Sequence, residues 1–139
     1  KTSGGKGMHI VVPLARQADW DGVKGFAKAV ATFMTRQVPE RFTDKMGPQN
    51  RIGKIFIDYL RNQRGASTAS AYSVRARPGL PVSVPIRRDE LDDLRSAAQW
   101  NVGNLQERLD SLKQDPWHDY HNRQRLTRAQ WKKLGAKPV

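Results

Sequence analysis

Hydrophobic side chains recur at helical spacing in one long stretch near the start of the chain. The stretch covers residues 20–37 and predicts an amphipathic helix. Its apolar positions are Trp20, Val23, Phe26, Ala27, Val30, Phe33 and Met34. Asp19 can cap the first turn, because its carboxylate accepts hydrogen bonds from free backbone N–H groups. Pro39 disfavours a helical Val38, so the helix is expected to end near Gln37.

Short runs of β-branched and aromatic residues predict strands between polar, turn-rich segments. The predicted strands are residues 8–14, 55–60 and 72–76. The run Ile-Phe-Ile-Asp-Tyr-Leu at residues 55–60 is the most strand-like, and strand alternation places Phe56 and Asp58 on one of its faces. Residues 82–86 are expected to be extended as well, but Pro85 cannot donate a ladder hydrogen bond and keeps them off the interior of a sheet.

The second half of the chain predicts two more helices and a basic tail. One helix begins at a cap formed by Asp89 and the other at a cap formed by Asn101, and Pro116 ends the second one. Their apolar positions are Leu91, Leu94 and Ala98 in the first helix and Val102, Leu105, Leu109 and Leu112 in the second. Residues 118–139 contain six Lys or Arg and one Asp, so we expect a peripheral or mobile tail with Trp131 as its docking residue. The order of elements predicts an α+β fold, in which helices cover a small mixed or antiparallel sheet.

The net charge, the lack of cysteine and the lack of a long apolar run limit the classes of function that this chain can have. The 139 residues carry 25 Lys and Arg against 13 Asp and Glu, a net charge of +12. This surplus favours a polyanionic partner, such as nucleic acid, a nucleotide or a membrane surface, over a small acidic protein. The lack of cysteine excludes a disulfide framework, a cysteine nucleophile and a thiolate zinc site, and no apolar run reaches the roughly 18 residues that span a bilayer. Because the chain begins at Lys1 without a Met, we expect it to be part of a longer protein.

A single carboxylate, Asp58, stands in the stretch from Arg51 to Arg77, where six Lys and Arg accompany it. Arg75 and Arg77 are two residues apart on a predicted strand and therefore share a face. Arginine binds phosphate through two parallel hydrogen bonds, and carboxylate oxygens suit Mg²⁺ or Mn²⁺. One interpretation is that Asp58 holds a divalent metal while the arginines hold a triphosphate. The alternative is a structural Asp–Arg ion pair among solvated arginines.

A glycine-rich segment opens the chain, reading Lys-Thr-Ser-Gly-Gly-Lys-Gly over residues 1–7. Consecutive glycines let backbone N–H groups turn toward an anion, while Ser3 can add a hydroxyl and Lys6 a charge. The segment is not a Walker A loop, because Lys6 is followed by glycine and a predicted strand rather than by Ser or Thr and a helix. His9, at the start of that strand, is near enough in sequence to bind the same phosphate. The alternatives are a flexible linker for the loop and a purely structural role for His9.

Several motifs, in the same order along the chain, make this sequence similar to a known family. They are Thr-Ser-Gly-Gly-Lys-Gly-Met-His at residues 2–9, Ile-Phe-Ile-Asp-Tyr-Leu-Arg-Asn at 55–62, Tyr-Ser-Val-Arg-Ala-Arg-Pro-Gly at 72–79, Pro-Val-Ser at 81–83 and Asp-Pro-Trp at 115–117. Together they resemble the polymerase domain of bacterial DNA ligase D, in the archaeo-eukaryotic primase superfamily, over residues 1–117. The resemblance implies the RRM-like part of a primase-type catalytic core, followed by residues 118–139 as a basic polar tail.

In that family the domain is a nucleotidyltransferase that repairs broken DNA ends together with the end-binding protein Ku and a ligase domain. It adds ribonucleotides or deoxyribonucleotides to a 3′ hydroxyl with a divalent metal, often manganese. The resemblance implies that Asp58 is a catalytic residue and a ligand of Mn²⁺ or Mg²⁺. The residues to which it assigns triphosphate binding are Ser3, Lys6, His9, Arg61, Arg75 and Arg77. It also implies DNA ends and nucleoside triphosphates as partners, no membrane, and a location in the bacterial cytoplasm.

The family pattern also contains an Asp-x-Asp pair upstream of the glycine loop, whereas this chain begins at the loop itself. Two-metal phosphoryl transfer needs several carboxylates, so one aspartate is not enough. We therefore expect the carboxy-terminal half of a catalytic domain, inactive when isolated. Two rival functions stay open: a non-catalytic basic module that binds nucleic acid, and a degenerate primase-like domain that only senses nucleotides. In the first rival, replacing a buried Asp58 with alanine would leave or improve DNA affinity.

Overall fold

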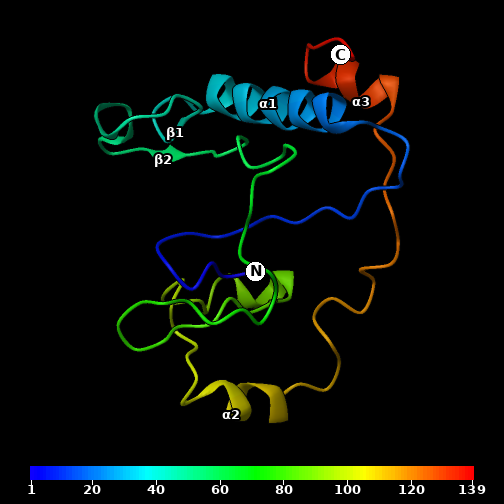
Figure 1. The fold of residues 1–139 in the computed structure, drawn as a ribbon. Coiled ribbons are helices and arrows are strands. Elements are labelled where there is room, and N and C mark those ends of the chain that lie inside the picture. The colour runs from blue at the N-terminus through cyan, green and yellow to red at the C-terminus, as the bar shows by residue number, and fades with distance from the viewer. The chain divides into compact units, whose positions relative to one another are not determined.

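A computed structural model describes all 139 residues, Lys1–Val139, and confirms the predicted α+β class (Figure 1). In chain order the elements are α1 (Trp20–Gln37), β1 (Phe42–Thr43), the 3₁₀ helix η1 (Pro48–Arg51), β2 (Ile55–Phe56), the 3₁₀ helix η2 (Arg88–Glu90), α2 (Leu105–Asp110) and α3 (Arg128–Lys133). The chain folds into two compact units. The first contains Lys1–Pro13 and Thr68–Arg123, and the second contains Leu14–Ser67 and Gln124–Val139. None of the helices is long and apolar enough to cross a membrane.

Helix α1 is the longest element of the second unit, and it spans the residues that the apolar spacing predicts. Asp19 caps it, because its side chain accepts a hydrogen bond of 2.8 Å from the backbone N–H of Gly22. The helix ends at Gln37, and the following Val38 donates its N–H to the carbonyl of Met34 at 3.0 Å. Both predicted ends of this helix are therefore confirmed.

The sheet of the second unit consists of two short parallel strands, β1 and β2. Its register pairs Phe42 with Ile55 and Thr43 with Phe56. One more bond follows, from the N–H of Ile57 to the carbonyl of Thr43 at 2.9 Å, and the chain then leaves the sheet before Asp58. The strand predicted over residues 55–60 is therefore too long, because only its first part finds a partner. The parallel pairing also differs from the mixed or antiparallel sheet that was expected.

Part of the predicted tail is a helix that packs on α1. Thr127 caps α3 by accepting a hydrogen bond of 3.2 Å from the N–H of Gln130. Trp131 is only 5% exposed and meets the ring of Phe26 edge-on, with the ring centroids 5.2 Å apart. The docking role predicted for Trp131 is confirmed, and α3 is a packed element of the second unit.

The segment of residues 82–86, predicted to be a short extended piece, forms the core of the first unit. Val82 and Val84 are fully buried, and Pro85 between buried neighbours is covered as well. Backbone hydrogen bonds reach the segment from three other parts of the unit. They are Thr2 N–H to Val84 O (2.9 Å), Ser83 N–H to Ser73 O (2.9 Å) and Val82 N–H to Trp100 O (2.8 Å).

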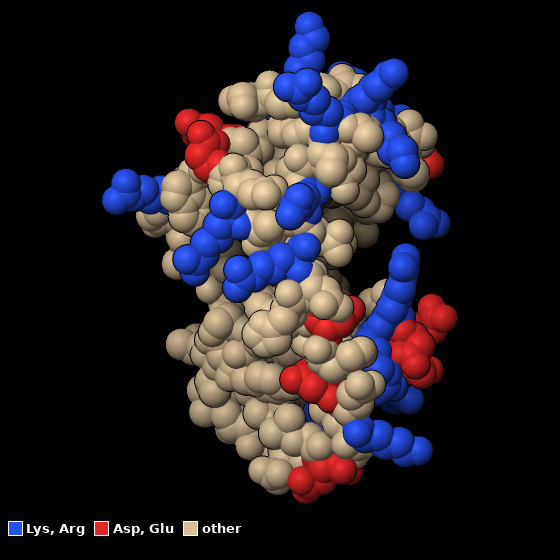
Figure 2. All heavy atoms as spheres, turned by 90° about the vertical axis from the view of Figure 1, so that its right-hand side faces the viewer, with Lys and Arg blue, Asp and Glu red and all other residues tan.

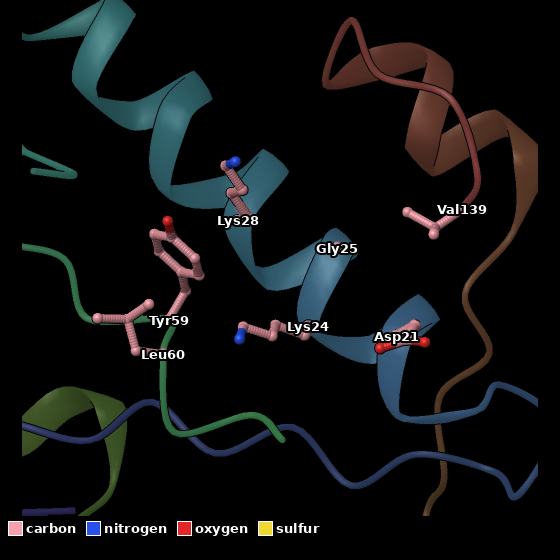
Figure 3. Close-up of a pocket in the computed structure, with 7 residues that line it drawn as sticks. All are labelled: Asp21, Lys24, Gly25, Lys28, Tyr59, Leu60 and Val139. Atoms are coloured by element: carbon pink, nitrogen blue, oxygen red, sulfur yellow. The ribbon is translucent and has the colours of Figure 1, made fainter. Parts of the chain in front are cut away.

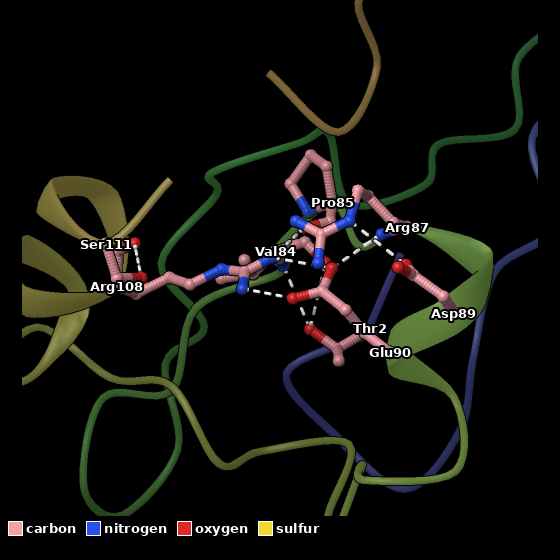
Figure 4. A network of polar contacts seen from close by, with 8 residues as sticks. All are labelled: Thr2, Val84, Pro85, Arg87, Asp89, Glu90, Arg108 and Ser111. Carbon is pink, nitrogen blue, oxygen red and sulfur yellow. Dashed lines mark hydrogen bonds and ion pairs between the residues drawn. The ribbon is translucent and has the colours of Figure 1, made fainter. Parts of the chain in front are cut away.

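A largely buried ion pair joins η2 to α2 within the first unit (Figure 4). Arg108 donates through both terminal nitrogens to the carboxylate of Glu90, and the Nη2–Oε2 distance is 2.9 Å. The guanidinium also lies over the ring of Trp100, 4.7 Å from its centroid. The hydrogen bond from Arg108 lowers the pKa of the Glu90 carboxyl, although burial acts in the opposite direction. This pair connects two elements whose own helical turns are short.

Two of the predicted strands are wrong, because their backbones pair at isolated positions only. The isolated bridges in these two segments are Thr2 with Met8, Leu14 with Gln124, and Val74 with Val82. Within residues 8–14, His9 exchanges backbone hydrogen bonds with Lys1, but no bridge continues from there to Leu14, and Ile10 is 89% exposed. At the start of residues 72–76, Tyr72 has a φ of 63°, which takes the backbone out of the extended conformation. Residues 72–76 do lie beside residues 81–83, with a hydrogen bond of 2.8 Å from the N–H of Arg75 to the carbonyl of Pro81, but only one bridge forms there. Strand propensity alone does not extend such a bridge into a ladder.

The two helices predicted between residues 89 and 112 are shorter than expected. At Asp89 only the single turn η2 forms. Further along, the carbonyl of Ala97 accepts a hydrogen bond of 2.9 Å from the N–H of Gly4, so it is used outside a helix. Helix α2 begins four residues after Asn101, because the Asn101 side chain accepts a hydrogen bond of 2.8 Å from the N–H of Gly103 and holds a turn.

Candidate functional site

The glycine-rich segment forms a closed loop in the first unit. The hydroxyl oxygen of Ser3 accepts hydrogen bonds from the backbone N–H groups of Gly5 (3.0 Å) and Gly7 (3.1 Å). The N–H of Ser3 in turn donates to the carbonyl of Gly7 at 3.0 Å. Ser3 is buried, whereas Lys6 at the tip is exposed. The backbone N–H groups that could bind an anion are thus used by the Ser3 hydroxyl. The loop can therefore contact a ligand mainly through its side chains.

Two arginines approach this loop closely because it lacks side chains. Arg75 donates from Nη1 to the carbonyl oxygen of Ser3 at 2.7 Å. A Cβ on Gly4 would lie 2.8 Å from Cγ of Arg75, and a Cβ on Gly5 would lie 2.9 Å from Nη1 of Arg77. The two glycines therefore make room for two arginine side chains. Three of the predicted site residues, Ser3, Arg75 and Arg77, come together in this way.

His9 is anchored in the same unit by Lys1, a residue to which the sequence assigns no role. The backbones of Lys1 and His9 exchange two hydrogen bonds of 2.9 Å. The side-chain nitrogen Nζ of Lys1 lies 2.7 Å from Nδ1 of His9 and donates to Oγ of Ser83 at 2.7 Å. Burial lowers the pKa of the Lys1 side-chain amine, and the charge of Arg75 lowers it further.

Asp58 and Arg61 belong to the second unit and follow β2 directly. Asp58 is exposed, and its side chain accepts a hydrogen bond of 2.9 Å from the N–H of Leu60. Both ion pairs of the structure lie in the first unit, so the Asp–Arg pair considered as a structural role for Asp58 does not form. The burial expected for Asp58 is wrong, because the sheet ends before it. Arg61 is exposed as well.

A groove of about 400 Å³ lies between α1 and the segment that follows β2, within the second unit (Figure 3). Its lining residues are Asp21, Lys24, Gly25, Lys28, Tyr59, Leu60 and Val139. Lys24 and Lys28 are four residues apart on one face of α1, and the ring of Tyr59 lies opposite them. Lys24 also donates to the side chain of Gln63. The side chains that line this groove carry a net positive charge, because the two ammonium groups of Lys24 and Lys28 outnumber the one carboxylate of Asp21.

The sequence matches a known domain over most of its length. The family model described as LigD, primase-polymerase domain, matches residues 1–117. The chain belongs to this family. The resemblance inferred from the motifs is therefore confirmed.

Relatives of this LigD domain occur in several bacteria. The multifunctional non-homologous end joining protein LigD of Pseudomonas aeruginosa is 60% identical over 137 residues, which are 97% of this chain and 16% of that protein. The bifunctional non-homologous end joining protein LigD of Bacillus subtilis is 28% identical over 124 residues, which are 87% of this chain and 20% of that protein. The chain thus spans about a sixth to a fifth of the length of these relatives.

A solved structure has the same fold as this LigD chain. The polymerase domain from Mycobacterium tuberculosis Ligase D, in complex with DNA, superposes with a TM-score of 0.64 at 30% sequence identity. The match covers 70% of this chain and 34% of that one. The α+β fold described above is therefore that of part of a LigD polymerase domain.

The carboxylates of this LigD chain do not make a metal centre by themselves. No group of three or more His, Asp or Glu side chains gathers where it could hold an ion. Asp58 is a single exposed carboxylate. An Asp-x-Asp spacing does occur at Asp19 and Asp21, but it follows the glycine loop instead of preceding it, and it lies at the start of α1. The capping role of Asp19 and the first-turn position of Asp21 account for that pair.

The positive charge is concentrated in the second unit. That unit carries fifteen Lys and Arg against five Asp and Glu, a balance of +10. The first unit carries ten against eight, a balance of +2. On the face drawn in Figure 2, basic side chains crowd the unit that contains α1, whereas those of the other unit alternate with acidic ones. The second unit is therefore the more strongly attractive one for a polyanion.

Lys1 and Ser83 are the residues that sequence reasoning missed. Lys1 could have been identified from the glycine-rich turn. A hairpin that turns over residues 3–7 places residue 1 opposite residue 9. No sequence pattern could have found Ser83, which lies 82 positions from Lys1 along the chain.

Proposed function

We propose that this chain forms part of a nucleotidyltransferase, which adds a nucleotide from a nucleoside triphosphate to the 3′ hydroxyl of a broken DNA end in non-homologous end joining. The observation that carries the proposal is the contact of Arg75 with the carbonyl of Ser3 at 2.7 Å, in a chain of the LigD family. It brings a guanidinium group, which suits phosphate, against the glycine loop.

In the proposed reaction the first unit binds the triphosphate. Arg75 uses one of its N–H groups on the loop and keeps others for phosphate oxygens, while the exposed Arg77 and Lys6 add charge. Ser3 can donate its hydroxyl hydrogen, since its oxygen accepts from the loop, and His9 adds a ring N–H. These cations would stabilise the negative charge that develops on the leaving pyrophosphate. Arg61 of the second unit is proposed to bind phosphate too.

Asp58 is proposed as one ligand of a Mn²⁺ or Mg²⁺ ion whose other ligands lie outside this chain. Such an ion would neutralise charge between the phosphates and align the attacking 3′ hydroxyl. Because this chain supplies a single carboxylate to the centre, the isolated chain is expected to lack extension activity. Measurable metal-dependent primer extension by the isolated chain would contradict that expectation.

DNA ends are the proposed macromolecular partner, with Ku and a ligase domain acting beside the polymerase in the bacterial cytoplasm. The balance of +10 on the second unit and its groove with Lys24 and Lys28 supply attraction for the phosphate backbone. The M. tuberculosis domain that shares this fold was solved in complex with DNA.

The test is a titration of the full-length protein with a fluorescent nucleoside triphosphate, with and without Mn²⁺. The variant Arg75→Ala/Arg77→Ala is expected to lose at least tenfold in affinity, because two guanidinium contacts to phosphate disappear. Arg88→Ala/Arg95→Ala is the matched control, since both side chains are exposed in the same unit and take part in no ion pair. Equal affinities for the two double variants would overturn the proposal.

The same charge balance supports a second candidate, a non-catalytic module that binds nucleic acid. Asp58→Ala separates the two functions. A pure binding module keeps or gains DNA affinity when the carboxylate is removed, and it has no extension activity to lose. The polymerase proposed here loses metal-dependent nucleotide binding and extension in the full-length protein.

A further inference from the structure

The hairpin around the glycine loop places the side chain of Lys1 against the ring of His9. The two residues face one another through paired backbone hydrogen bonds, so their side chains leave the hairpin at the same level. Lys1 Nζ then lies 2.7 Å from His9 Nδ1. Lys1 is only 9% exposed, and its amine is within reach of Ser83 as well. This buried cation has no carboxylate partner, because neither ion pair of the structure includes it.

The direction of the hydrogen bonds around Lys1 follows from the donors available. Ser83 has one hydroxyl hydrogen, and it donates this hydrogen to the carbonyl of Thr2 at 2.7 Å. Ser83 Oγ must therefore accept from Lys1 Nζ, as its distance of 2.7 Å indicates. A lysine ammonium has three hydrogens and no lone pair, so it can only donate to Nδ1 of His9. A neutral imidazole whose Nδ1 accepts carries its hydrogen on Nε2.

We propose that Lys1 is a positioning residue, which holds His9 in the tautomer with its hydrogen on Nε2 and so presents an N–H donor to the triphosphate. The inference rests on the proposed function, in which His9 contacts a phosphate of the incoming nucleotide. With the opposite tautomer, Nε2 would turn a lone pair toward the phosphate oxygens, and the contact would be repulsive. Lys1 acts through His9 and does not touch the nucleotide itself.

The groups around Lys1 are expected to make this arrangement sensitive to pH. The groups that face its amine are the His9 ring, the Ser83 hydroxyl and the cationic Arg75. Burial and Arg75 lower the pKa of the amine from its ordinary value of 10.5. Once the amine loses its proton it can accept as well as donate, and the constraint on the His9 tautomer is released. The constraint is therefore lost at a lower pH than the pH at which an ordinary lysine side chain loses its charge.

The tautomer can be measured directly by nitrogen NMR of the chain with ring-labelled histidine. The chain contains three histidines, and His9→Gln identifies the signals of His9 by their absence. We expect Nε2 to carry the hydrogen at neutral pH, and we expect a mixture of tautomers in Lys1→Met. Lys1→Arg, which keeps a buried cationic donor, is expected to restore the single tautomer. A wild-type spectrum with the hydrogen on Nδ1, or no change in Lys1→Met, overturns the inference. Even if Lys1→Met fails to fold, a wild-type spectrum with the hydrogen on Nδ1 still overturns the inference.

A binding cycle in the full-length protein separates positioning from general stability. Lys1→Met is expected to weaken nucleoside triphosphate binding by about tenfold, the effect of one hydrogen bond to a charged group. Glutamine at position 9 has an amide N–H and no tautomer to set, so in the His9→Gln background Lys1→Met is expected to change affinity less than twofold. The same tenfold loss in both backgrounds would mean that Lys1 is only structural and would overturn the inference. If His9→Gln and His9→Ala both bind as tightly as wild type, the proposed phosphate contact of His9 fails, whatever tautomer the spectrum shows.

Discussion

Ser3 shows how a single side chain can serve its own loop. Its hydroxyl oxygen accepts from the N–H groups of Gly5 and Gly7, the position that an anion would otherwise occupy. The proposed phosphate binding would then depend on the side chains around the loop, above all on Arg75 and Arg77. The conformation of the loop depends on close contacts that only glycine permits.

Gly4 is the residue on which this geometry depends most, and Gly4→Ala tests it. Its φ of 66° is strained for any residue with a Cβ, and the new Cβ would lie 2.8 Å from Cγ of Arg75. We expect a loss of about 1–2 kcal/mol in the free energy of unfolding and weaker triphosphate binding, because Arg75 must move. Gly7→Ala is the matched control, since Gly7 lies in the same loop without a positive φ and with open space around it. Urea unfolding and nucleotide titration of both variants provide the measurement, and equal losses would contradict the prediction.

The pair of Glu90 and Arg108 predicts a pH dependence of stability. The pKa of the Glu90 carboxyl is lowered in the folded chain, so its contribution is present above the ordinary value of 4.5 and is lost as the pH falls through the lowered value. Glu90→Gln leaves a largely buried guanidinium without its counter-charge and is expected to cost about 3 kcal/mol at neutral pH. The loss shrinks in acid, where the wild-type pair is broken too.

Asp89→Asn provides the control for this pH experiment. Its ion pair with Arg87 is exposed, with side-chain exposures of 72% and 46%, and such pairs contribute at most about 1 kcal/mol. Urea unfolding at neutral and acidic pH measures both variants. A Glu90→Gln loss as small as that of Asp89→Asn, or one independent of pH, would refute a stabilising role of the buried pair.

At the scale of elements, length and partner availability separate the predictions that succeeded from those that failed. Helix α1 follows from its sequence, because eighteen residues with regular apolar spacing and a cap favour a helix in almost any context. The strand at residues 8–14 does not form because a strand needs a neighbour that sequence alone does not locate. Residues 72–76 do have residues 81–83 as a neighbour, but Tyr72 leaves the extended conformation and only one bridge forms. Residues 82–86 form the core of the first unit because three segments from other parts of the chain make backbone hydrogen bonds to them.

The contact between α1 and α3 is the element-scale feature that one substitution tests. Trp131→Ala removes a side chain that is 5% exposed and packed on Phe26, and we expect it to cost about 3–5 kcal/mol. Trp20→Ala is the matched control, because Trp20 starts α1 but is 56% exposed, and its loss is expected to stay near about 0.5 kcal/mol. Chemical denaturation, followed by circular dichroism at the helical band, compares them. If the two variants lose similar stability, α3 is not anchored through Trp131.

At the scale of the whole molecule, the uneven charge is the main feature. The second unit carries +10 of the net +12, and this imbalance cannot be seen from the total charge alone. The units are made of segments that alternate along the chain, so a count by position in the sequence mixes them. Folding thus sorts a basic chain into one strongly basic unit and one nearly balanced unit.

Lys24→Gln/Lys28→Gln tests whether the basic unit binds the DNA backbone. Removal of one cation that touches a phosphate is expected to reduce the slope of log affinity against log salt by roughly 0.9, so the double variant should bind duplex DNA more weakly and with less dependence on salt. Arg88→Gln/Arg95→Gln removes the same charge from the first unit and is expected to keep most of the slope. Fluorescence anisotropy of labelled DNA over a range of salt concentrations measures both. Equal slopes for the two double variants would show that only net charge matters.

Local sequence was enough to establish the family, the α+β class, helix α1 with both its ends, and the docking of Trp131. These follow from spacing, capping and motifs, which involve residues close to one another in the chain. Three further features became apparent only in the folded chain: Arg75 rests on the Ser3 carbonyl, Lys1 holds His9 with the help of Ser83, and Asp58 is exposed. Each depends on a contact, or on the lack of one, between segments far apart in sequence, because hydrogen bonds and burial are set by neighbours in space.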